Sequence, residues 1–254
     1  VLGMVDDPAN QAQYVFKHNF GSEGHLAIYG GPSSGKTTLL QTIIKSMACL
    51  NHPGDVNFYI MDFAGRTLGA LVDFPHVGDV LFEEDEEKAL SLFRMLRREM
   101  DKRKNLNSEL GVNTINEYRK TTEEKIPLLV MVIDNISVFN LNYYEKVEDV
   151  FDRIIQEGPS LGIVVIFTAN SSNEVKLKIS TNVSVNIALE LADKSEYLFI
   201  IGRTEGLYPA HFPGRGLYNS DPPLEFQVAL PAPGIYEAER TRDIKQFALR
   251  MRNS

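Results

Sequence analysis

A glycine-rich loop carries the clearest chemical signal in this sequence. Residues 30–37 read GGPSSGKT and match G-x-x-x-x-G-K-[ST], whose glycines let successive backbone N–H groups point at an anion. An apolar run precedes the loop and a helical pattern follows it, so we favour a phosphate-binding loop over a plain glycine turn. The N-terminus of that helix would add positive potential beneath the phosphates of ATP. The predicted nucleotide-binding residues are Gly30, Gly31, Pro32, Ser33, Ser34, Gly35, Lys36, Thr37 and Thr38.

Three side chains of this loop have distinct expected roles. Lys36 would reach the β- and γ-phosphates, the Thr37 hydroxyl would ligate Mg²⁺, and Thr38 would meet the α-phosphate. A second metal ligand is expected at the end of an apolar strand, and Asp134 follows the run LLVMVI at 128–133. Asp134 would hold Mg²⁺ directly or through water. The alternative is that Asp134 caps the next helix.

The position after Asp134 argues against rapid hydrolysis. Hydrolytic proteins of this class often place a glutamate there to polarise the attacking water, whereas this chain has Asn135. An amide cannot accept a proton, so general-base assistance is missing at this degenerate catalytic position. The sequence therefore predicts ATP binding more strongly than ATP hydrolysis, and leaves enzymatic activity open.

Four other polar residues are candidates for the site. Asp62 ends an apolar run and would face the nucleotide or a neighbouring subunit, although a turn or helix cap is favoured. Asn170 ends another run and is a candidate sensor of the γ-phosphate or the attacking water. Arg203 and Arg215 lie in late loops, from which a ring-forming ATPase could offer an arginine to its neighbour. For both arginines, a surface salt bridge is the favoured interpretation.

Short apolar runs alternate with helical patterns and must position these residues. Runs rich in β-branched and aromatic residues are typical of strands buried on both faces of a parallel sheet. The alternation predicts an α/β fold of the RecA-like P-loop NTPase type, with helices covering both faces of a mostly parallel sheet. The expected strands are 25–30, 56–61, 128–133, 162–167, 185–189 and 224–230, and the expected helices are 36–50, 84–104 and 236–251.

Turn residues late in the chain indicate its domain organisation. The run PAPG at 231–234 is interpreted as a boundary. We therefore expect an ATPase domain over 1–234 and a linker helix toward a following domain over 235–254. Both termini are expected to be cut edges of a longer protein. The helix at 84–104 begins with acidic and ends with basic residues, which its dipole favours, so its charges are expected to be solvated.

Composition narrows the classes of function. The chain has 254 residues, 43% hydrophobic and 24% charged, which suits a globular protein with a substantial core. Its formal net charge of −8 argues against nucleic acid as the main partner. The single cysteine, Cys49, excludes an internal disulfide, favours a reducing compartment and is expected to fill the core. Scattered histidines argue against a zinc site, and no apolar run is long enough to span a bilayer.

Taken together, the chain resembles the FtsK/SpoIIIE-type ATPase domains, and specifically the tandem domains of the EssC/EccC coupling ATPases of type VII secretion. The resemblance covers nearly the whole chain and is greatest to a middle or later domain of the tandem array. It rests on MVDDP at 4–8, GHLAI at 24–28, FYIMDFAG at 58–65, FPHVG at 74–78, VID at 132–134, TAN at 168–170, PGRG at 213–216 and PPLEFQ at 222–227.

The resemblance implies ATP and Mg²⁺ as cofactors, sister ATPase domains and a hexameric ring as candidate partners, and small helical-hairpin proteins as exported substrates. It also implies a location at the cytoplasmic face of the bacterial membrane, through an upstream segment that this sequence does not contain. DNA-pumping members, and the first domain of the secretion ATPase, carry Asp-Glu where this chain has Asp134 and Asn135. The resemblance therefore does not imply full motor activity for this chain.

Three functions remain open on the sequence. The leading hypothesis is an ATP-binding module that hydrolyses ATP weakly or not at all and regulates or couples protein export. The first alternative is an active hexameric FtsK-like DNA translocase, although no basic tail or winged-helix module is present. The second is a docking module in which the nucleotide is structural.

Overall fold

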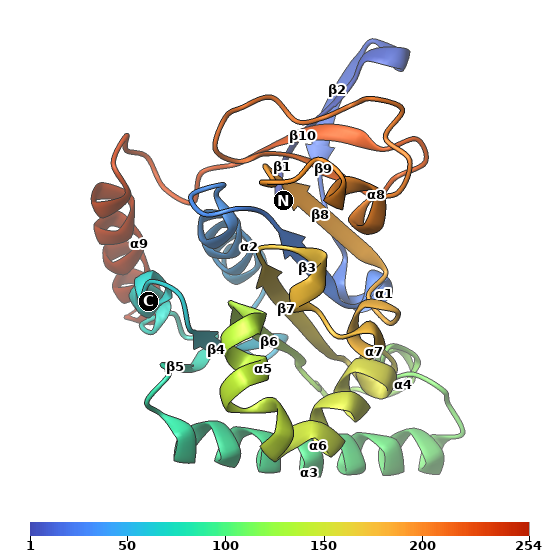
Figure 1. Ribbon diagram of the computed structural model, residues 1–254. Helices are drawn as coiled ribbons and strands as arrows, with labels where there is room; N and C mark the ends of the chain where they lie inside the picture. Colours follow the sequence, from blue (N-terminus) through green and yellow to red (C-terminus); the bar gives the residue numbers. More distant parts are fainter. Residues whose placement is uncertain (254) are drawn as a thin grey trace.

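Nearly continuous apolar runs form the central strands of a ten-stranded sheet within residues 1–253, the part of the chain that the computed structural model describes (Figure 1). Six neighbouring strands are parallel, and four more extend the sheet in antiparallel pairs. The mostly parallel α/β sheet expected from the sequence is confirmed. The order is β2 (Ala12–Phe16), β1 (Gly3–Asp7), β10 (Leu224–Val228), β9 (Arg215–Tyr218), β8 (Val185–Leu189), β3 (Leu26–Tyr29), β7 (Ile163–Ala169), β6 (Leu128–Asp134), β4 (Val56–Asp62) and β5 (Val77–Leu81).

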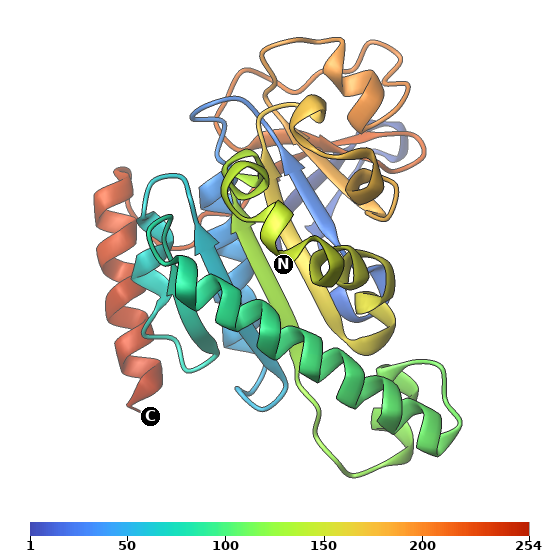
Figure 2. The same cartoon turned by 60° about the horizontal axis from the view of Figure 1, so that its bottom comes forward.

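Helices cover both faces of the parallel strands (Figures 1 and 2). Successive residues of a strand point to opposite faces, so Met131 of β6 packs with Phe93 and Phe151 while Val130 packs with Leu39 on the other side. One face is covered by α3 (Glu86–Leu110), α5 (Ile136–Asn142) and α6 (Tyr144–Glu157), and the other by α2 (Lys36–Leu50) and α9 (Glu237–Arg252).

Shorter elements complete the connections. They are α1 (Phe20–Glu23), α4 (Ile115–Thr121), α7 (Leu177–Ser180) and α8 (Glu196–Ile200), with 3₁₀ turns η1 (Pro8–Asn10), η2 (Thr67–Leu71), η3 (Gly158–Leu161) and η4 (Ser172–Glu174). None of the helices within residues 1–253 is long and apolar enough to cross a membrane.

The sequence located the central parallel strands but missed both edge strands and two strands of the antiparallel part. Observed bounds of α2 and β8 equal the expected ones, and those of β3, β4, β6 and β7 differ by at most two residues. Strands β1, β2, β5 and β9 were not predicted, because each is short and at least partly exposed and none forms an apolar run.

The last helix, α9, packs on the rest of the structure. Ile244 and Ala248 are fully buried, and the Phe247 ring lies 6.0 Å from that of Phe74. The Lys45 ammonium lies 4.8 Å from the Phe247 ring centroid and donates a hydrogen bond of 2.6 Å to the Pro231 carbonyl. The helix α9, residues 237–252, therefore rests on the preceding domain by its apolar face. That residues 235–254 lead to a following domain stays a prediction.

Two side chains differ from their expected environments. Arg103 was expected to be solvated but is fully buried, and its Nη1 donates to the carbonyls of Leu161 and Gly162 at 2.9 and 3.0 Å. Its Nε donates to Glu99 of the same helix at 2.8 Å. The arginine therefore ties α3 to the turn between α6 and β7. Cys49 was expected in the core but is exposed, because the buried stripe of α2 passes through its neighbour Ala48.

The burial of Arg103 yields a first prediction. Arg103→Ala should lower the free energy of unfolding by about 3 kcal/mol, because it leaves two buried carbonyls and part of Glu99 unpaired. Urea denaturation followed by circular dichroism measures this change. Arg98→Ala, an exposed arginine of the same helix, is the matched control and should stay within about 0.5 kcal/mol of wild type. Equal effects of the two substitutions would contradict the structural role of Arg103.

Candidate functional site

Four neighbouring parallel strands end at one edge of the sheet, where α/β proteins usually bind ligands. Gly30 follows β3 and its N–H donates to the Ala169 carbonyl at the end of β7, at 3.0 Å. The Gly31 N–H donates to the Glu190 carbonyl just after β8, at 2.7 Å. These bonds fix the start of the loop between two strand ends. A cavity of about 440 Å³ opens beside it, within the usual range for ligand sites.

Local sterics explain two glycines of the loop. A Cβ at Gly30 would lie 2.4 Å from Ser34 Oγ, so a side chain there would collide with the curled loop. Gly35 has φ of +105° and leads directly into α2, in a conformation that L side chains rarely adopt. The Gly214 N–H donates to the Ser34 carbonyl at 2.8 Å, so the PGRG turn at 213–216 supports the loop from outside.

The cavity offers donors suited to phosphate. The Ser34 hydroxyl is not one of them, because its Oγ is buried beside Gly30 on the inner side of the loop, where it has no hydrogen-bond partner within residues 1–253. The Lys36 ammonium donates to the carbonyls of Gly30 and Gly31 at 2.6 and 2.9 Å, and to Asn170 Oδ1 at 3.0 Å. Burial lowers the pKa of Lys36. The negative charge of a bound phosphate would stabilise the protonated Lys36 ammonium and so offset this effect of burial.

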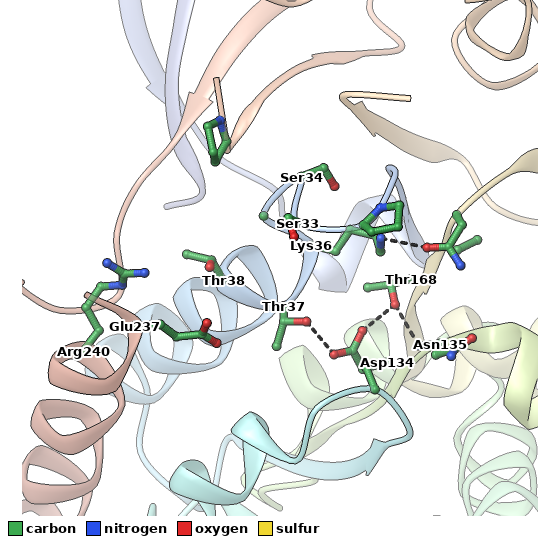
Figure 3. Close-up of a pocket in the computed structure, with 16 residues that line it drawn as sticks. Ser33, Ser34, Lys36, Thr37, Thr38, Asp134, Asn135, Thr168, Glu237 and Arg240 are labelled. Atoms are coloured by element: carbon green, nitrogen blue, oxygen red, sulfur yellow. Dashed lines mark hydrogen bonds between the residues drawn. The ribbon is translucent and has the colours of Figure 1, made fainter. Parts of the chain in front are cut away.

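Asp134 is the centre of a hydrogen-bonded cluster (Figure 3). The hydroxyl of Thr37 donates to Oδ2 at 2.8 Å, and that of Thr168 donates to Oδ1 at 2.6 Å. Thr37 and Asp134 thus present a hydroxyl and a carboxylate at the same point, the oxygen ligands that Mg²⁺ prefers. Residues 1–253 hold no cluster of three or more acidic, His or Cys side chains suited to a metal. Mg²⁺ in phosphate sites normally needs only one or two carboxylates, so the donor set fits.

Burial makes the Asp134 charge costly. Desolvation raises the pKa of Asp134 above its usual range, against the opposing effect of the two threonine hydroxyls. The carboxylate of Asp62, on the neighbouring strand, raises it further, and Lys36 lowers it. A bound cation would favour the charged form of Asp134.

Asn135 adopts a special backbone conformation. It has φ of +79°, and its N–H donates to Thr168 Oγ1 at 2.8 Å. Its side-chain oxygen accepts from the Val138 N–H at 3.4 Å and caps α5. The alternative that Asp134 caps this helix is therefore wrong, since Asn135 occupies the cap. The Asn135 side chain also lines the cavity, at the position where hydrolytic proteins place a base.

Asn170 is fixed by a residue that sequence reasoning missed. Its backbone N–H and its Nδ2 donate to the two oxygens of Glu174, at 2.7 and 3.0 Å. This bidentate contact orients the amide so that Oδ1 faces Lys36. In the sequence, the contact between Asn170 and Glu174 is indicated only by the spacing of four residues between them. The assignment of Asn170 as a sensor stays a prediction.

Three sequence candidates lie outside the cavity. Asp62 accepts hydrogen bonds from three backbone N–H groups of the loop after β4, of which Leu68 is the shortest at 2.9 Å. It therefore caps that loop, as favoured from the sequence. Arg215 lies 3.7 Å from Glu225, and Arg203 is exposed. The cavity also includes Glu237 and Arg240 of α9, which the sequence could not place because they lie 200 residues from the loop.

With this geometry established, comparison with protein families matches residues 4–205 to the FtsK/SpoIIIE family. The match covers most of the chain, so the protein belongs to the FtsK/SpoIIIE family. This class of P-loop ATPases agrees with the sheet, the glycine loop and the Asp134 cluster described above.

Its relatives within the family are type VII secretion proteins. The chain is 32% identical over 231 residues to the type VII secretion system protein EssC of Staphylococcus aureus, covering 91% of this chain and 16% of that protein. The structure resembles EssC ATPases 2 and 3 of Geobacillus thermodenitrificans, with TM-score 0.91 and 29% identity over 99% of this chain and 48% of that one. EccC ATPases 2 and 3 of Thermomonospora curvata, in complex with a signal sequence peptide, give TM-score 0.87 and 27% identity over 99% and 46%.

These likenesses confirm the resemblance to EssC/EccC ATPase domains, and the neighbours are second and third ATPase domains, as expected for a middle or later domain. The chain spans only 16% of the length of the curated relative. Activities of the whole secretion protein are therefore a matter for proposal.

The loop geometry yields a second prediction. Mg-ATP at a hundred times its Kd should stabilise the fold by about 2.7 kcal/mol, because ligand that binds only the folded state shifts the unfolding equilibrium. Differential scanning fluorimetry measures the rise in Tm. Lys36→Ala should abolish the rise, whereas Lys102→Ala, which changes an exposed lysine of α3 outside the cavity, should retain it. An unchanged Tm of nucleotide-free wild type at millimolar Mg-ATP would contradict the site.

The raised pKa of Asp134 yields a third prediction. A carboxyl group whose folded pKa is raised favours folding when protonated, and that contribution is lost as pH rises through the folded pKa. Without nucleotide, Asp134→Asn should therefore have a higher Tm than wild type near neutral pH, and the difference should shrink in acid. A gain of 1 kcal/mol corresponds to about 2–4 °C for a domain of this size.

The exposed aspartate of α6, Asp149, provides the control for this measurement. Asp149→Asn should not raise the Tm. An Asp134→Asn variant less stable than wild type at neutral pH would show that the two threonine hydrogen bonds outweigh the desolvation of the carboxylate.

Proposed function

We propose that this chain is an ATP-binding module of a type VII secretion ATPase, which hydrolyses ATP weakly or not at all and regulates or couples protein export. The observation that carries the proposal is the pairing of an intact P-loop and Asp134 cluster with Asn135, an amide already engaged as a helix cap. The residues proposed to bind Mg-ATP are therefore in place, whereas residue 135 cannot accept a proton from the attacking water.

Binding is supported by preformed groups. Backbone N–H groups of the loop and the Lys36 ammonium would contact phosphate oxygens, while Thr37 and Asp134 would hold Mg²⁺. Mg²⁺ held there would supply positive charge that offsets the negative charge of the phosphate oxygens. Thr168 would keep the Asp134 carboxylate in place by its hydrogen bond to Oδ1.

Slow hydrolysis is supported by the side chain at position 135, which is an amide. An attacking water must lose a proton, and the amide of Asn135 cannot accept it. The carboxylates of Asp62 and Glu174 are engaged by other groups, and Glu237 lies in the part of the cavity away from Asn135. Asp62 accepts three backbone N–H groups, and Glu174 holds both donors of Asn170.

The relatives suggest partners and location. The neighbouring structures are named as ATPases 2 and 3, one of them in complex with a signal sequence peptide. By analogy we propose that this domain works beside sister ATPase domains, recognises small exported proteins, and acts at the cytoplasmic face of the bacterial membrane. The comparisons do not favour the DNA-translocase alternative, and the net charge of −8 also argues against it.

The degenerate position gives the test of this function. Asn135→Glu should raise kcat for ATP by about 10²-fold or more while leaving ATP affinity nearly unchanged, because a positioned general base typically contributes about 10²- to 10⁴-fold. Steady-state phosphate release and equilibrium nucleotide binding measure the two quantities. Asn105→Glu, which places the same charge on the exposed face of α3, is the control and should leave kcat unchanged.

Two outcomes would contradict the proposal. One is wild-type protein that turns over ATP at several molecules per second, with Asn135→Ala leaving that rate intact. The other is hydrolysis stimulated by duplex DNA in a steeply salt-dependent manner, which would favour the translocase.

A further inference from the structure

The first turn of α9 forms one wall of the nucleotide cavity. Glu237 and Arg240 line the cavity together with the P-loop residues, although α9 follows the last strand of the sheet. In Figure 3 the Arg240 side chain lies on the side of Thr38 that is remote from Lys36 and Asn135, and the Glu237 side chain lies below Thr38, between Arg240 and Thr37. The P-loop itself contributes residues 32–38 to the same cavity.

The direction of a bound nucleotide follows from these positions. The γ-phosphate end would lie at Lys36 and Asp134, and the α-phosphate would lie at Thr38 on the first turn of α2. A nucleoside attached to that α-phosphate must continue past Thr38. The charged groups that line the cavity in this direction are those of Glu237 and Arg240.

The two side chains suit a nucleoside. The Glu237 carboxylate accepts hydrogen bonds only, so it matches the hydroxyls of a ribose and would repel a phosphate. Arg240 Nη1 donates to the carbonyls of Gly234 and Ile235 at 3.1 and 2.8 Å, which fixes the guanidinium plane. A fixed guanidinium plane can stack on a purine ring.

The position of this wall depends on packing at the other half of the helix. Ile244 and Ala248 are fully buried against the domain, and Phe247 packs on Phe74 and beneath Lys45. Loss of these contacts would remove Glu237 and Arg240 from the cavity without touching the P-loop. Any ligand that contacts both the P-loop and α9 must in turn favour the docked helix.

We infer that the first turn of α9 is the nucleoside subsite, and that nucleoside binding and docking of α9 on the domain stabilise each other. This inference rests on the proposed binding of ATP at the P-loop. It assigns the triphosphate to the loop and the ribose and base to the C-terminal helix. The occupancy of the site is thereby coupled to the position of residues 237–252.

Two probes separate the subsites, namely Mg-ATP and magnesium tripolyphosphate, which has the phosphates but no nucleoside. Glu237→Ala and Arg240→Ala should each weaken Mg-ATP binding to the 254-residue chain by about tenfold, the loss expected for one charge-assisted contact. Tripolyphosphate affinity should be unchanged. Arg250→Ala, an exposed arginine on the same helix, should change neither affinity.

Hydrogen exchange measures the coupling itself. Mg-ATP should slow amide exchange over residues 237–252, and tripolyphosphate should not. Ala248→Asp, which places a charge in the buried seam away from the cavity, should weaken Mg-ATP and spare tripolyphosphate. The Glu237 and Arg240 variants, whose side chains lie at the surface, keep the test valid if Ala248→Asp does not fold.

The outcomes are distinguishable. If neither probe binds wild type, the proposed function fails, and this inference fails with it. If both probes bind, and the Glu237 and Arg240 variants leave the ratio of the two affinities as in wild type, only the nucleoside subsite is overturned. If the ratio shifts but α9 exchanges equally fast with and without Mg-ATP, the coupling is overturned.

Discussion

The buried carboxylate of Asp134 is the interaction on which the site depends. It lies at the end of a fully buried strand and accepts hydrogen bonds from Thr37 at the start of α2 and Thr168 near the end of β7. Three elements from separate parts of the chain are thus tied at one point. Burial raises the pKa of Asp134, and a bound cation would favour the charged carboxylate.

Local sequence was enough to predict the parts of the site that are contiguous or end a strand. The P-loop is a single segment, and its glycines reveal its shape. Asp134 and Asn170 end apolar runs, and parallel strands bring such ends to one edge. The central sheet was predicted for the same reason, because strands buried on both faces are nearly all apolar.

Features that depend on distant contacts could not be predicted. Glu237 lines the cavity only because α9 docks by Ile244 and Ala248, which a helical pattern alone does not reveal. Arg103 is at the basic end of a helix in sequence, yet the turn after α6 buries it. The antiparallel strands β1 and β2 have too few buried residues to produce an apolar run. In each case tertiary packing, and not local propensity, decided the outcome.

The hydrogen bond from Gly214 to the Ser34 carbonyl has a mechanical consequence. Gly214 also accepts from the Val228 N–H at the end of β10, and the next residue, Ala229, donates to Leu2 beside β1. A force that pulls the chain before Leu2 along the axis of β1 would therefore act first on β1, then on the end of β10, and then on the outer side of the P-loop. Since β1 and β10 pair antiparallel along their length, such a pull would shear several hydrogen bonds together instead of peeling them one by one. The P-loop is thus linked through Gly214 to a strand pair whose hydrogen bonds would have to break together under such a force.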